Sequence, residues 1–207
     1  MEINKSYLRG WADSEMEALK SSDEISIENL FTGLMYGLAT FARDEPSESK
    51  LEKFIDINKH YSNDSALFEV GCYLYFRVDL WLFKNKPNLR EKISAGFIKE
   101  FNKLFSKALG IVNSYIHELF NERINKYGEM IRKGEEIKTY HFYLSQLILY
   151  TKDGSLPGKH DFKKMKLVMN FFDDWALKMK LLSWETTMLP SIIGSLEKYC
   201  NLLESKL

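Results

Sequence analysis

Residues 66–83 read ALFEVGCYLYFRVDLWLF, one of the two most apolar stretches of this 207-residue chain. As a helix, the stretch carries apolar side chains on nearly every side, which is typical of a helix surrounded by other helices. Three charged residues interrupt it, namely Glu69, Arg77 and Asp79, so it does not have the composition of a membrane span. We therefore expect residues 66–83 to form the central helix of a bundle.

The residues that follow carry the longest helical pattern in the chain. From residue 89 to residue 133 there is no proline, and large apolar side chains return every three or four positions, as at Ile93, Phe97 and Phe101. This pattern predicts one long helix over 89–133. We expect a bend near Gly110 or Gly128 rather than a break, because no turn-forming residues stand beside Gly110.

Helical spacing also covers most of the remaining chain, and no segment alternates as a half-buried strand would. Helix breakers are scarce, with four Pro and eleven Gly, and the length of the chain favours one domain. The expected fold over residues 1–207 is a single-domain, all-α bundle of about seven or eight helices. The further helices are expected over 5–20, 26–42, 49–58, 137–151, 162–182 and from 190 onward.

Charge and cysteine content indicate which partners to expect and in which compartment the protein acts. A net charge of zero argues against nucleic-acid and anionic-membrane partners. Residues 1–56 hold six Lys/Arg against twelve Asp/Glu, so we expect this acidic part to pack on the basic remainder, within one molecule or across a dimer. Cys72 and Cys200 lie in unrelated contexts, and the first residues lack the apolar run of a signal peptide. These features predict a cytoplasmic protein with no membrane attachment.

The motifs of metal and cofactor chemistry are absent from the sequence. No His has a Glu three residues before it, as di-iron helical bundles require. There is no phosphate-binding glycine loop, Cys-x-x-Cys pair or nucleophile elbow. His117, Glu118 and Glu122 lie on adjoining helical faces, and the ordinary polar surface of a helix explains them without a metal. We expect no cofactor, no metal and no catalytic residue.

The candidate binding residues are Glu69, Tyr73, Arg77 and His141. The first three follow one another four residues apart along one side of the central helix, whereas Asp79 points about 160° away from Arg77. A charge among apolar groups must be paired, hydrated or functional. Two interpretations are open: a polar network with a neighbouring helix, or a cleft in which Arg77 receives an anion that Glu69 or Tyr73 orients. His141 stands among three aromatic residues, as a packed residue at the core edge or as part of a ligand site.

These observations favour a binding module that interacts with another protein or with a second copy of itself. A first alternative is a small-ligand binder or enzyme with a pocket around Glu69, Tyr73 and Arg77. A second alternative is a nucleic-acid binder that uses residues 84–107, which hold seven Lys/Arg against two acids. The aromatic residues of that segment fall on the apolar stripe rather than beside the lysines, which argues against base stacking.

Overall fold

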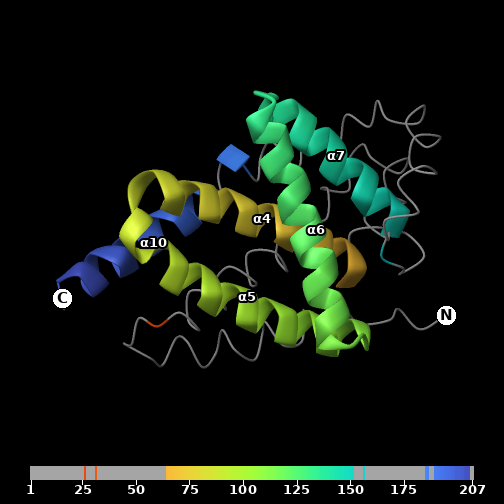
Figure 1. The fold of residues 1–207 in the computed structure, drawn as a ribbon, viewed down its shortest axis with the longest axis horizontal. Coiled ribbons are helices and arrows are strands. Elements are labelled where there is room, and N and C mark those ends of the chain that lie inside the picture. The colour runs from red at the N-terminus through yellow and green to blue at the C-terminus, as the bar shows by residue number, and fades with distance from the viewer. Residues whose placement is uncertain are drawn as a thin grey trace, which may run out of the picture.

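The structure is a computed structural model that describes residues 64–151 and 189–205, together with Ser26, Phe31, Leu156, Glu185 and Thr186. These residues contain no strand, which confirms the all-α class for this part of the chain. They hold five helices rather than seven or eight. The helices expected over 5–20, 49–58 and 162–182 fall outside them, as does all of 26–42 except Ser26 and Phe31. The five helices (Figure 1) are α4 (Asp64–Asn85), α5 (Pro87–Leu109), α6 (Asn113–Arg132), α7 (Ile137–Tyr150) and α10 (Leu189–Glu204).

Helix α4 is the centre of this arrangement, as the sequence predicts. Residues 65–76 are all buried, and α4 packs against α5, α6, α7 and α10. In Figure 1 it runs through the middle of the molecule, with α6 crossing it. Beyond Val78 the helix approaches the surface, and Phe83 is 59% exposed. The first three turns of α4 are therefore covered on every face, as expected of a central helix.

The expected long helix over 89–133 is wrong, because the chain breaks between α5 and α6. Gly110 has a φ of 65°, a left-handed conformation that costs glycine no steric penalty and closes the end of a helix. The N–H of Ile111 donates to the carbonyl of Ser106 at 3.1 Å, and the Ser106 hydroxyl donates to the Ile111 carbonyl at 2.6 Å. Gly110 and Ser106 thus supply the turn chemistry that the sequence pattern did not reveal.

Helix α6 ends at Arg132, one residue before the end expected at residue 133. Gly134 has a φ of 67°, its N–H donates to Ile131 at 2.8 Å, and the N–H of Glu135 donates to Met130 at 3.0 Å. These two bonds form a Schellman motif, the commonest way for a helix to end at a glycine. Helix α7 then begins at Ile137 and turns back along α4.

Aromatic rings fill the space between α4 and its neighbours. Toward α5 and α6, Phe101 lies 4.5 Å from Phe105 and 5.0 Å from Phe120, measured between ring centroids. Toward α7, Tyr127 stacks on Phe76 at 4.9 Å and meets Tyr143 edge-on at 5.3 Å. The second group is rich in tyrosine, and it lies next to the polar residues of α4.

Within the part of the chain that the structure describes, no helix combines the length and the apolar character needed to cross a bilayer.

Candidate functional site

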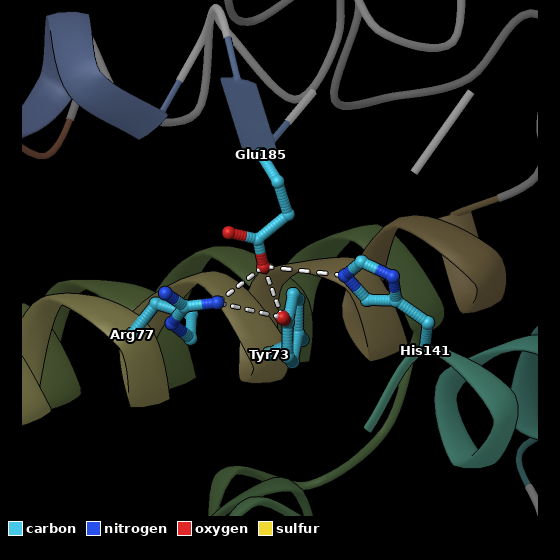
Figure 2. Close-up of polar contacts among 4 residues, drawn as sticks. All are labelled: Tyr73, Arg77, His141 and Glu185. Atoms are coloured by element: carbon cyan, nitrogen blue, oxygen red, sulfur yellow. Dashed lines mark hydrogen bonds and ion pairs between the residues drawn. The ribbon is translucent and has the colours of Figure 1, made fainter. Parts of the chain in front are cut away.

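The carboxylate of Glu185 brings together side chains from two helices. The Tyr73 hydroxyl donates to its Oε1 atom, Nη1 of Arg77 lies 2.5 Å from the same atom, and Nε2 of His141 lies 3.3 Å from it. Figure 2 shows Glu185 reaching toward α4 from one side while His141 approaches from α7. Because an ionised carboxylate only accepts hydrogen bonds, Nε2 of His141 must carry a proton to bond to it. We call Tyr73, Arg77 and His141 the three-donor site.

The helical repeat explains how two of these donors meet. Tyr73 and Arg77 are four residues apart on α4, so their side chains lie on one face, one turn from each other. Nη1 of Arg77 donates to the Tyr73 hydroxyl at 3.1 Å, and that hydroxyl donates in turn to Glu185. His141 meets the Tyr73 ring edge-on at 5.8 Å. The three donors therefore contact one another as well as the carboxylate.

The site lies at the boundary between the core and the surface. Tyr73 is fully buried, whereas the side chains of Arg77, His141 and Glu185 are 18%, 12% and 9% exposed. An ion pair at this depth loses part of its hydration yet remains within reach of solvent, so its strength lies between those of surface and core pairs.

The electrostatics favour an ionised carboxylate in the three-donor site. Burial raises the pKa of Glu185, but hydrogen bonds from His141 and Tyr73 and the charge of Arg77 outweigh burial and hold the pKa below its usual value of 4.5. Burial is also the main reason that the pKa of the Tyr73 hydroxyl is raised, so this hydroxyl keeps its proton and remains a donor. The site can thus bind an anion by charge and by directed hydrogen bonds.

Glu69, the first of the predicted site residues, belongs to a different contact. Its carboxylate accepts from Arg123 of α6, with Nη2 to Oε1 at 2.8 Å and Nε to Oε2 at 3.0 Å, and neither side chain is exposed. Burial raises the pKa of Glu69 despite the opposing charge of Arg123. The structure therefore divides the predicted stripe into a fully buried ion pair at Glu69 and the three-donor site around Tyr73 and Arg77.

Neither Arg123 nor Glu185 is among the site residues predicted from the sequence, although the sequence around each offers an indication. Arg123 lies on the buried face of α6, three residues after Phe120 and four before Tyr127. It is therefore a charged residue at a position where the helical pattern expects an apolar one. Glu185 is the only charged residue between Lys180 and Glu197. The reasoning that selected Glu69 and Arg77 applies equally to both.

Asp79 points toward α5, away from the site, as the helical geometry predicts. Its two oxygens accept from Nε and Nη2 of Arg90 at 2.9 and 2.7 Å, and Ser94 donates to Oδ1 at 2.8 Å. Arg90 is therefore engaged with Asp79, and Lys86 is engaged with Glu204 of α10 at 2.7 Å. Lys103 lies 3.7 Å from Oε2 of Glu100, so three of the seven basic residues in 84–107 form ion pairs within the molecule.

A hollow of about 470 Å³ lies along α6. Its lining is mostly carboxylates and carboxamides, and Oε2 of Glu122, one of the lining residues, lies 3.7 Å from Nη1 of Arg123. His117 lies 2.8 Å from the Asn102 amide, measured from Nδ1 to Nδ2. The residues that line the hollow along α6 are Glu118, Asn121, Glu122, Asn125, Lys126, Glu129 and Tyr143.

The described residues contain no group of three or more His, Cys, Asp or Glu placed to hold a metal ion.

Comparison with known proteins adds no identity. No family model, curated protein or solved structure matches the chain.

Proposed function

We propose that this protein is a non-catalytic binding module and that the three-donor site receives a carboxylate side chain from a partner protein. The observation that carries the proposal is the convergence of Tyr73, Arg77 and His141 on one carboxylate oxygen of Glu185. Glu185 lies 112 residues from Tyr73 along the chain and 108 from Arg77. The donors thus already hold the acidic side chain of a distant polypeptide segment, and a partner's acidic segment would present the same chemistry.

The arrangement has the two features of a good anion site. Arg77 supplies a permanent positive charge, and hydrogen bonds to an ionised group are about twice as strong as neutral ones. The hydrogen bond from Arg77 to Tyr73 and the ring contact from Tyr73 to His141 fix the donors in place. Donors that are already ordered lose little conformational entropy when a ligand binds, and this raises affinity.

Binding fits the site better than catalysis does. A general base works best when its pKa lies near the working pH, and enzymes raise the pKa of a carboxylate to reach that range. The pKa of Glu185 is shifted the other way, below 4.5. A carboxylate that gives up its proton this readily acts as a held anion rather than as a proton acceptor.

The predicted cytoplasmic location is part of this proposal. Cys72 and Cys200 are both free and buried, as expected of thiols in a reducing compartment. A partner protein with an acidic segment, or the acidic part of a second copy, would meet the site there.

The test is chemical rescue of a variant that lacks the occupant. Glu185→Ala removes the carboxylate and one methylene, which together equal an acetate ion. Loss of a partly buried partner of Arg77 costs about 2 kcal/mol, which lowers Tm by about 4–8 °C. We expect acetate to restore part of this Tm relative to chloride at equal ionic strength, because an anion that binds only the folded state stabilises it.

Two controls separate site binding from a general salt effect. Glu204→Ala removes the exposed carboxylate that pairs with Lys86 and should show no selective response to acetate. Glu185→Ala combined with Arg77→Ala should lose the rescue. Equal rescue in all three variants would show that the three-donor site does not bind carboxylates, and the proposed function would then be wrong.

A further inference from the structure

Glu185 occupies the position that a ligand of the three-donor site would take. Its Oε1 atom accepts from Tyr73, Arg77 and His141 together, so a second carboxylate cannot bind the same donors while Glu185 remains. Any external carboxylate must first displace it.

We infer that Glu185 is an internal competitor, and that an acidic partner binds by releasing the segment at residues 185–186 from α4 and α7. This inference rests on the proposed function. The site alternates between a closed state that holds Glu185 and an open state that holds the carboxylate of the partner.

The secondary structure places the movable part on the Glu185 side of the contact. Tyr73 belongs to a helix that is buried without interruption from residue 65 to residue 76, and it packs against Tyr127 at 5.4 Å between ring centroids. Glu185 and Thr186 lie in a π-helical turn, and Thr186 is exposed. Helical turns of this kind are rare and occur often at functional sites. The donors therefore belong to helices of 22 and 14 residues, whereas their occupant lies in a turn beside an exposed residue.

The competition sets the expected affinity. A protein whose binding-competent state is only partly populated binds its ligand more weakly by that fraction. Minor states of such equilibria hold about 0.1–10% of the molecules, so removal of the internal competitor should strengthen binding by about 10- to 1,000-fold.

The experiment uses the full chain and a peptide that carries the carboxylate the site accepts. The probe is a fluorescent nonapeptide with the sequence of residues 181–189, LLSWETTML, and its control has Gln in place of the Glu. Binding is measured by anisotropy to the wild-type protein and to Glu185→Gln, which keeps the side-chain volume and removes the charge. We expect Glu185→Gln to bind the probe about 10- to 1,000-fold more tightly, and we expect the Gln peptide to lose this gain.

Two further variants make the failures distinguishable. Arg77→Ala added to Glu185→Gln should abolish the gain, and Glu204→Gln, which removes an exposed negative charge, should produce none. Equal, Arg77-dependent affinity for wild type and Glu185→Gln would refute the internal competition and leave the proposed function standing. A gain that persists without Arg77, or no binding by any variant, would refute both.

A second measurement uses the wild-type protein alone and does not depend on the folding of a variant. Saturating probe should increase hydrogen exchange at the amides of Glu185 and Thr186, while the amides of α4 stay protected. Unchanged exchange at residues 185–186 under saturation would overturn the release of this segment.

Discussion

Glu69 and Glu185 are both carboxylates held by an arginine, yet their pKa values move in opposite directions. Glu69 is fully buried, and the cost of desolvating its charge outweighs the attraction of Arg123. Glu185 is partly exposed, and the hydrogen bonds and charge of the three-donor site outweigh its smaller desolvation. Depth of burial therefore decides the sign of each shift.

The lowered pKa of Glu185 predicts a pH dependence of stability. A carboxyl whose folded-state pKa lies below its unfolded value of 4.5 stabilises the fold above about pH 4.5, and this contribution is lost as the pH falls through the folded-state pKa. The raised pKa of Glu69 acts in the opposite sense, because it removes stability as the pH rises above 4.5. The difference in unfolding free energy between wild type and Glu185→Gln isolates the Glu185 contribution. Urea titrations from pH 7 to pH 3 should show this difference shrink below pH 4.5, and a constant difference would contradict the assignment.

The buried pair of Glu69 and Arg123 predicts a second difference. Arg123→Met leaves the Glu69 carboxylate without this partner and should cost about 3–5 kcal/mol. Glu69→Leu combined with Arg123→Met removes both charges, and replacement of a buried pair by apolar side chains is often close to neutral. Chemical denaturation should therefore find the double variant more stable than the single one. A double variant no more stable than the single one would contradict the cost assigned to an uncompensated Glu69 carboxylate.

At the scale of elements, the sequence predicts the interior of each helix better than the joints between helices. The apolar run at 66–83 predicts α4 to within two residues at each end, and the helix expected over 137–151 is observed as α7 over 137–150. The break at Gly110 was missed because α5 and α6 both pack on α4, so apolar residues keep a helical spacing on each side of it. Periodicity reports which face is buried, and it does not report whether the backbone runs straight.

The two glycines considered for the bend in 89–133 should respond oppositely to substitution. A Cβ at Gly110 would meet no atom within 4 Å, so the cost of Gly110→Ala comes from its φ of 65° and should be about 1–2 kcal/mol. Gly128 lies inside α6, and the nearest atom to a Cβ there is Nη1 of Arg132 at 4.0 Å. Gly128→Ala should therefore stabilise the protein by about 0.5–1 kcal/mol. Thermal unfolding of the two variants provides the comparison, and a shift of the same sign in both would contradict the role of Gly110 as a helix cap.

At the scale of the whole molecule, contacts between distant parts of the chain are what local spacing cannot predict. Spacing placed Tyr73 beside Arg77, but it could not place Glu185 on them, since that partner lies more than 100 residues away. The same holds for Lys86 and Glu204, which join the start of α5 to the end of α10. The acidic part at residues 1–56 lies largely outside the described residues, so its packing on the basic remainder stays a prediction, as does self-association.

A double-mutant cycle between Arg77 and Glu185 measures the central contact directly. Unfolding free energies of wild type, Arg77→Met, Glu185→Gln and the double variant give the coupling between the two side chains, and the cycle of Lys86→Met and Glu204→Gln is the control. We expect a coupling of about 1–3 kcal/mol between Arg77 and Glu185, and less than about 1 kcal/mol for the exposed pair. A coupling between Arg77 and Glu185 no larger than that of the exposed pair would show that the three-donor site does not hold a carboxylate.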